Sequence, residues 1–227
     1  MRLPSLNATP RACLAIRLPP TKGWKLSSDA HLAQPAAPPP VASPALGSTA
    51  TRKARLRSYP PAGIHNSLYH FPKVTGGYLR VIRNSLLIII ARYAPFFWLK
   101  TLIYRALGMR VGKHTAIGFM VMMDIFFPQD ITIGADTLIG YNSVILCHEF
   151  MRHEWRRGPV VIGRDVTIGA NTTILAGVVI GDGATISAMS LVNRDVPPGA
   201  FVGGVPIRLL APPSAPASRT NDAHEAE

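Results

Sequence analysis

The chain is predicted to be mainly β, and its second half is predicted to form a parallel β-helix of six-residue repeats. Large aliphatic residues recur at intervals of six, as Ile162, Ile168, Ile174, Ile180, Ile186 and Val192. A small or β-branched residue stands two positions before each of them, as Val160, Val166, Thr172, Val178, Ala184 and Ser190. A strand repeats every two residues and a helix about every 3.6, so a period of six indicates short straight segments joined by corners.

The corners of the predicted coil carry residues that tolerate unusual backbone dihedrals. Glycine follows three of the aliphatic residues, at Gly163, Gly169 and Gly181. The same phase is present upstream at Ile133, Ile139 and Ile145. Three straight segments close one coil, and self-similarity at this short period is typical of a parallel β-helix.

The two ends of the chain lack this periodicity. Residues 1–60 are rich in Pro, Ala, Ser and Arg and show no sustained apolar period, so we expect a disordered extension. The shortage of acidic residues there also suits an organelle transit peptide, and a start codon assigned too far upstream is a further alternative. Residues 211–227 are polar and are expected to form a flexible tail.

Residues 61–108 are predicted to form a short helical segment ahead of the β-helix of residues 109–210. Apolar residues are dense between Gly77 and Leu107, and Pro95 divides them into two helices. The apolar run at 86–91 is far shorter than the roughly 20 residues that a helix needs to cross a bilayer. We expect the helices to cap the β-helix, and the alternative is an interfacial contact of residues 77–107 with anionic lipid.

Charge and cysteine content exclude two classes of function. Residues 1–110 hold 16 basic residues and one acid, whereas residues 111–227 hold 8 basic and 11 acidic residues, so the β-helix itself is mildly acidic. The basic part lacks a nucleic-acid-binding motif, so no nucleic acid partner is expected. Cys13 and Cys147 lie in very different contexts, which indicates reduced thiols and a cytoplasmic location rather than a disulfide framework.

The repeat breaks after Ile145 and resumes near Val160, which leaves residues 147–158 out of register. Functional residues concentrate in such excursions, because the coils themselves are occupied by packing. His148 stands at the start of the excursion, and an imidazole with a pKa of about 6.5 can accept a proton at physiological pH. His148 is therefore the candidate general base. His153 is the alternative, and Glu149 or Glu154 could orient the imidazole.

The chain resembles the hexapeptide-repeat acyltransferases, and among them the sugar O-acetyltransferases of galactoside, maltose and nodulation type. Three segments carry the resemblance, namely Gly158–Gly163, Ile168–Asn171 and the closing segment Val196–Arg208. The resemblance implies a left-handed β-helix, a homotrimer, acetyl-CoA as donor and no metal. It also implies transfer of acetyl to a hydroxyl of a saccharide or another small polar acceptor.

The resemblance further implies a role for individual residues. His148 takes the proton of the acceptor hydroxyl, which attacks the thioester directly, and the N–H of Ala170 binds the oxyanion. Asp124 is the polar residue nearest to the position at which relatives bind their acceptor. The CoA groove, which lies between two subunits, is lined by Ala188, Asn193, Arg194 and Arg208, the last of which approaches phosphate.

Three other functions compete with acetyl transfer. His148, His153 and His114 resemble the zinc site of γ-class carbonic anhydrases, in which a metal-bound hydroxide is the nucleophile. Cys147 could be a nucleophile with His148 as its base, although adjacent residues on an extended backbone point in opposite directions. A non-catalytic trimeric scaffold is the third alternative.

Overall fold

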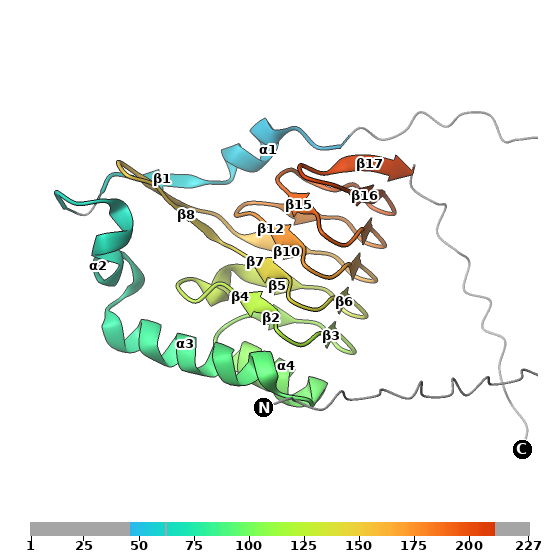
Figure 1. Cartoon of the computed structure of the whole chain (residues 1–227), viewed down its shortest axis with the longest axis horizontal. Coiled ribbons are helices and arrows are strands. Elements are labelled where there is room, and N and C mark those ends of the chain that lie inside the picture. Colours follow the sequence, from blue (N-terminus) through green and yellow to red (C-terminus); the bar gives the residue numbers. More distant parts are fainter. Residues whose placement is uncertain (1–45, 62, 212–227) are drawn as a thin grey trace, which may run out of the picture. The chain divides into compact units, whose positions relative to one another are not determined.

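The computed structural model describes residues 46–61 and 63–211, and within them three parallel sheets form a β-helix (Figure 1). The first sheet contains β2 (Arg110–Val111), β5 (Ile131–Ile133), β10 (Val160–Ile162) and β13 (Val179–Ile180). The second contains β3 (Ala116–Ile117), β6 (Leu138–Ile139), β11 (Thr167–Ile168), β14 (Thr185–Ile186), β16 (Phe201–Gly203) and the antiparallel β17 (Arg208–Ala211). The third contains β4 (Met122–Met123), β7 (Val144–Ile145), β12 (Thr173–Ile174) and β15 (Leu191–Val192).

Successive coils are aligned residue upon residue. Val161 pairs with Val179 and Thr173 pairs with Leu191, so one coil after the excursion takes 18 residues, or three sides of six. The two earlier steps, from Val111 to Ile133 and from Ile133 to Ile162, are longer because they contain insertions. The aliphatic residues of the repeat point inward and are buried, as the six-residue period predicts. Their removal from water is the main stabilising term of the β-helix.

Two corner glycines allow the coils to approach closely. A Cβ atom added to Gly169 would lie 2.3 Å from the backbone nitrogen of Ala188 on the next coil, and one added to Gly140 would lie 2.6 Å from the nitrogen of Ala170. Asn171, which follows at the same corner, has a positive φ of 56°. These positions therefore require residues that fit tight or left-handed backbone.

The two helices predicted around Pro95 are present as α3 (Tyr78–Tyr93) and α4 (Phe97–Ala106), which follow a 3-10 turn at Ser67–His70 and α2 (Phe71–Thr75). They pack against the first coil (Figure 1). Asn84 Nδ2 donates to Ile125 O at 3.0 Å, and Lys100 Nζ donates to Gly118 O at 2.7 Å. Side-chain bonds to the backbone thus anchor each helix to the coil.

A helix that spans a membrane must be long enough and apolar enough, and these two criteria can be applied to the helices of the described residues. None of them meets both criteria alone, whereas Ser67–Thr75 and Tyr78–Tyr93 meet them together as a pair bent by 94°.

The expected disorder of residues 1–60 is wrong for residues 46–60, and residues 1–45 lie outside the described part of the chain. Residues 49–54 form α1 (Thr49–Ala54), and β1 (Arg57–Tyr59) pairs antiparallel with β9 (Trp155–Arg157). Arg52 is buried, and its Nη1 donates to Glu149 Oε1 and to Ala176 O, each at 2.9 Å. Such short elements are stabilised by long-range contacts, which local composition does not reveal.

Candidate functional site

The excursion between β7 and β10 folds into a hairpin, and the N-terminal segment adds a third strand to it. β8 (His148–Phe150) pairs with β9, and β9 pairs with β1, in the order β1-β9-β8. His148, Arg157 and Arg57 form one cross-strand row. Because residues in one row project from the same face of a sheet, these three side chains share a face.

The candidate base His148 is paired with Asp124. Nδ1 of His148 lies 2.5 Å from Oδ2 of Asp124, whose side chain has no exposed surface. Asp124 immediately follows β4, and His148 lies at the end of the coil stacked on it, because Met123 pairs with Ile145. A carboxylate can only accept hydrogen bonds, so Nδ1 is the donor of this pair, and in the neutral form of the imidazole Nε2 keeps its lone pair.

Backbone donors hold the Asp124 carboxylate in place. Oδ1 accepts from the N–H of Phe126 at 2.8 Å and of Phe127 at 2.9 Å, and Oδ2 accepts from the N–H of Cys147 at 2.6 Å. Burial alone would raise the pKa of Asp124, but the hydrogen bond and charge of His148, together with the backbone bonds, outweigh it and lower the pKa below its ordinary value. The buried carboxylate therefore stays ionised.

Aromatic side chains surround the imidazole of His148. The ring centroid of Phe126 lies 4.9 Å away in an edge-to-face arrangement, and that of Phe150 lies 5.0 Å away. The His148 side chain retains 15% of its exposure. The imidazole is therefore fixed on three sides but remains accessible to a ligand.

The structure corrects two expectations about carboxylates. Glu149 and Glu154 were the candidates for orienting the imidazole, but Glu149 pairs with Arg52 and Glu154 pairs with Arg156. Asp124 was expected to contact the acceptor, but its buried carboxylate faces His148 instead. The orienting residue was missed because its partner is distant in sequence. The two residues become neighbours because Met123 pairs with Ile145, a step that does not fit the six-residue period of the sequence.

Cys147 is not arranged as a nucleophile. Its side chain is fully buried in the core, and this burial, with the nearby charge of Asp124, raises the pKa of the thiol well above its usual range. The adjacent His148 pairs with Asp124 rather than with the thiol. The expectation that Cys147 is a packing residue agrees with this burial.

The other predicted site residues fall on two different corners of the coil. Ala170 and Ala188 lie on successive coils of the corner between the second and third sheets, where Met189 N donates to Ala170 O at 2.9 Å. Asn193 and Arg194 lie with His148 on the corner between the third and first sheets. Within one chain, one side of the coil therefore separates His148 from Ala170.

Arg208, Asn193 and Arg194 are the remaining residues that were predicted to line the CoA groove. Arg208 is exposed on β17, where it pairs with Gly203 at the end of the second sheet. Asn193 Oδ1 and Arg194 Nε are buried and have no hydrogen-bond partner among the described residues. Buried polar atoms are normally paired, so these two mark a place where a ligand or another subunit could supply the partner.

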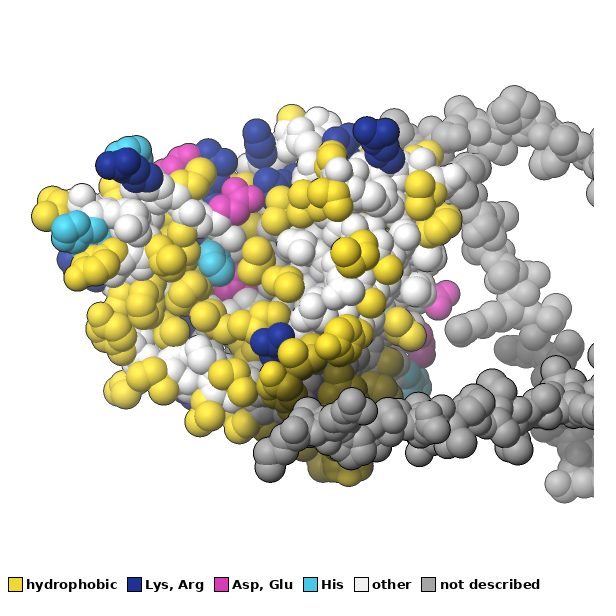
Figure 2. Space-filling view, viewed as in Figure 1, with side chains coloured by type: hydrophobic (Ala, Val, Ile, Leu, Met, Phe, Trp, Pro, Cys, Tyr) yellow, Lys and Arg dark blue, Asp and Glu magenta, His cyan; other side chains and the backbone are white. Residues whose placement is uncertain are grey.

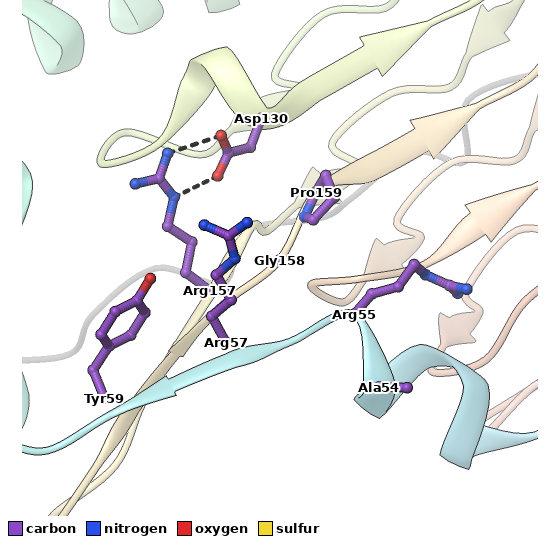
Figure 3. Close-up of a pocket in the computed structure, with 8 residues that line it drawn as sticks. All are labelled: Ala54, Arg55, Arg57, Tyr59, Asp130, Arg157, Gly158 and Pro159. Atoms are coloured by element: carbon purple, nitrogen blue, oxygen red, sulfur yellow. Dashed lines mark hydrogen bonds and ion pairs between the residues drawn. The ribbon is translucent and has the colours of Figure 1, made fainter.

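A cavity of about 550 Å³ lies beside the excursion sheet, on the side of β1 (Figure 3). Arg57 and Arg157 project side by side from neighbouring strands, and Arg157 makes two bonds to Asp130, of 2.5 and 2.8 Å. The guanidinium of Arg157 also lies 4.1 Å from the ring centroid of Phe127. His148 is not among the residues that line this cavity.

The three histidines that the carbonic anhydrase alternative requires as zinc ligands do not lie together. His114 lies 3.4 Å from Asp136, His148 pairs with Asp124, and His153 lines a separate cavity at the tip of the hairpin. Across residues 46–61 and 63–211, no three His, Cys, Asp or Glu side chains are grouped as metal ligands.

Comparison with known proteins agrees with the repeat of the coil. Residues 159–194 match the model of the bacterial transferase hexapeptide (six repeats). The chain is 54% identical over 151 residues to YvoF of Bacillus subtilis, described as a candidate acetyltransferase, which covers 66% of this chain and 87% of YvoF. It is 31% identical to the galactoside O-acetyltransferase of Escherichia coli, over 50% of this chain and 59% of that protein.

Comparison with solved structures also finds hexapeptide-repeat acetyltransferases. A hexapeptide-repeat acetyltransferase of Vibrio cholerae, crystallised with acetyl-coenzyme A, superposes with a TM-score of 0.52 at 28% identity, over 60% of this chain and 88% of that one. Galactoside acetyltransferase in complex with coenzyme A, with a TM-score of 0.51 at 20% identity, shares the fold. By its repeat, its structure and its similarity to YvoF over most of that protein's length, the chain belongs to the hexapeptide-repeat acetyltransferases.

Proposed function

We propose that this protein transfers the acetyl group of acetyl-CoA to a hydroxyl group of a saccharide, with His148 as general base. The observation that carries the proposal is the pair of Asp124 and His148, in which a buried, ionised carboxylate holds a partly exposed imidazole. Membership of the acetyltransferase family gives the reaction class, and the Vibrio cholerae relative crystallised with acetyl-coenzyme A supports the donor.

The imidazole does its work through Nε2. The acceptor hydroxyl donates its proton to Nε2 while its oxygen forms a bond to the thioester carbonyl carbon. The tetrahedral intermediate then breaks its C–S bond, and the leaving thiolate takes the proton back from Nε2 as CoA thiol. Asp124 stabilises the imidazolium that exists between these two transfers, as a positioned carboxylate does for other histidine bases.

The oxyanion of the intermediate requires a donor, for which we propose the N–H of Ala170. Ala170 and Ala188 lie on one corner of the coil, whereas His148, Asn193 and Arg194 lie on another. A site that uses both corners needs two copies of the chain. We therefore propose a homotrimer of left-handed β-helices, with the CoA arm between adjacent subunits and Arg208 near its phosphates.

The surroundings of His148 favour a sugar as the acceptor. The ring of Phe150, which is only partly buried, lies 5.0 Å from the imidazole and offers a flat apolar surface of the kind on which the C–H face of a pyranose packs, whereas the buried Phe126 holds the imidazole from the protein side. The named activity of the Escherichia coli relative, galactoside O-acetylation, agrees in class.

Acetyl-CoA turnover tests the proposal directly. Release of CoA thiol is measured with panels of sugar and amine acceptors, for the native chain and for His148→Ala. Acceptor-dependent release that falls by about a hundredfold or more in His148→Ala is the expected result. His153→Ala, in the same excursion, is the matched control and should retain activity. Absence of release from the native chain, or an unaffected His148→Ala, would refute the proposal, and CO₂ hydration with bound zinc would favour the anhydrase instead.

A further inference from the structure

Helix α3 has two apolar faces, and the described residues cover only one of them. Val81, Ile88 and Ala91 are buried against the first coil. A second stripe, whose members recur at helical spacing, lies on the opposite side and is at least 47% exposed at each position: Leu79, Ile82, Leu86, Ile89, Ile90 and Tyr93. A helix that packs on a core needs one apolar stripe, so the second stripe indicates a partner.

The exposed stripe leads into the beginning of α4. Four large side chains there are more than half exposed, namely Phe96, Phe97, Trp98 and Leu102. We call these four and the α3 stripe the apolar helix face. Figure 2 shows hydrophobic side chains gathered over the region in which Figure 1 places α2 and α3. Trp and Tyr among long aliphatic residues are typical of surfaces that lie at the level of lipid headgroups.

The charged side chains of the helices that carry the apolar helix face are all basic. The sequence contains no Asp or Glu from residue 46 to residue 123. Lys73 and Arg80 are exposed on α2 and at the start of α3, and Arg83 and Arg105 are exposed farther along α3 and α4. Two copies that met through this face would bring these cations together. An anionic bilayer would complement them instead.

We propose that the apolar helix face docks on the surface of an anionic lipid bilayer, so that α3 lies in the plane of the headgroups. The apolar stripe would enter the interface, and Lys73, Arg80 and Arg83 would contact anionic headgroups at its border. This proposal does not depend on the reaction or on its acceptor.

Vesicle flotation of the full-length protein tests this docking. The protein is mixed with vesicles of phosphatidylcholine alone or with one part in about three of phosphatidylglycerol, at low salt and at about 1 M NaCl. We expect flotation with the anionic vesicles at low salt, and less at high salt because the attraction of the cations is screened. The variant Ile82→Gln/Leu86→Gln should bind about tenfold more weakly, and Lys73→Gln/Arg80→Gln should lose most of the salt dependence.

A matched control separates docking from a general loss of apolar surface. Leu138, on β6 of the coil, is 48% exposed, so Leu138→Gln removes a comparable side chain outside the apolar helix face and should bind like the native chain. All variants are compared by circular dichroism and by sedimentation equilibrium. The proposal is overturned if the native chain does not float, if Ile82→Gln/Leu86→Gln floats equally well, or if that variant changes the oligomeric state, which would assign the face to a second copy.

Discussion

Replacing Asp124 with Asn tests the centre of the proposed site with the smallest change in shape. The carboxylate accepts four hydrogen bonds, of 2.5–2.9 Å, from His148 Nδ1 and from the N–H groups of Phe126, Phe127 and Cys147. An amide has one oxygen, so its NH₂ group must face either the imidazole and Cys147 or the other two N–H groups. In the first case the NH₂ group meets the N–H of Cys147, while the imidazole can change tautomer and accept; in the second case it meets two N–H donors.

The expected loss of activity follows from the tautomer. If the amide oxygen stays with Phe126 and Phe127, its NH₂ group donates to Nδ1 of His148, and the ring proton moves to Nε2. Nε2 can then no longer accept the proton of the acceptor hydroxyl. We expect kcat to fall by about 10²- to 10⁴-fold, the usual contribution of a general base, with little change in KM for acetyl-CoA.

The same substitution should lower stability, and its pH dependence has a definite sign. One buried N–H without an acceptor costs about 1–3 kcal/mol. The folded-state pKa of Asp124 lies below its unfolded value of about 3.9, so the stability it contributes is fully present above about pH 5 and is lost as the pH falls through the folded pKa. The difference in the free energy of unfolding between Asp124→Asn and the native chain should therefore narrow below about pH 4.

A double variant decides whether Asp124 acts through the imidazole. Thiol release is measured for Asp124→Asn, for His148→Ala and for both together. If the carboxylate only positions His148, the double variant should be no less active than His148→Ala alone, because residues that act as a unit are not additive. Asp124→Asn activity within about threefold of the native value, or multiplication of the two losses, would refute the positioning role.

Three further predictions concern the scaffold. Arg52→Met, which removes the bonds to Glu149 and to the coil, should cost about 1.5–3 kcal/mol in urea unfolding, whereas the exposed neighbour Lys53→Met should cost almost nothing. Cys147 should resist alkylation in the native protein, and mass spectrometry of its peptide should show labelling only after unfolding. Gly169→Ala should lower the stability by about 1–3 kcal/mol, because its Cβ would meet backbone of the next coil; an unchanged Tm would contradict this.

The coil could be predicted from the sequence because its period is a local property. From Ile180 to Val192, each inward aliphatic residue stacks on the residue 18 positions earlier, as Ile180 does on Ile162, so the sequence itself shows the period of the coil. The two helices around Pro95 follow from local composition in the same way. Residues 46–60 could not be predicted, since α1 and β1 are too short to form without Arg52 bonding to the coil and β1 pairing with β9.

The candidate base could be predicted from its position in the repeat. Its carboxylate partner could not be predicted from the local sequence. His148 is recognisable because it begins the break in the repeat. Asp124 lies 24 residues earlier and becomes its neighbour only because Met123 and Ile145 pair across coils. Glu149 and Glu154 are closer in sequence, yet strand pairing directs them to arginines. Contacts of this kind depend on which residues pair between coils. The pairing register must therefore be known before the partner of a side chain can be predicted.

The division of the predicted site between two corners can be tested by mixing subunits. Ala188 is exposed, so Ala188→Trp should fold and block the proposed CoA groove, while His148→Ala removes the base. If each site joins the His148 corner of one subunit to the Ala188 corner of the next, subunits mixed equally, unfolded and refolded together should regain about a quarter of the native activity. The two inactive variants mixed without subunit exchange are the control. If the refolded mixture stays inactive while both variants refold to native oligomers, the reaction is confined to one chain, and the proposed groove between subunits is wrong.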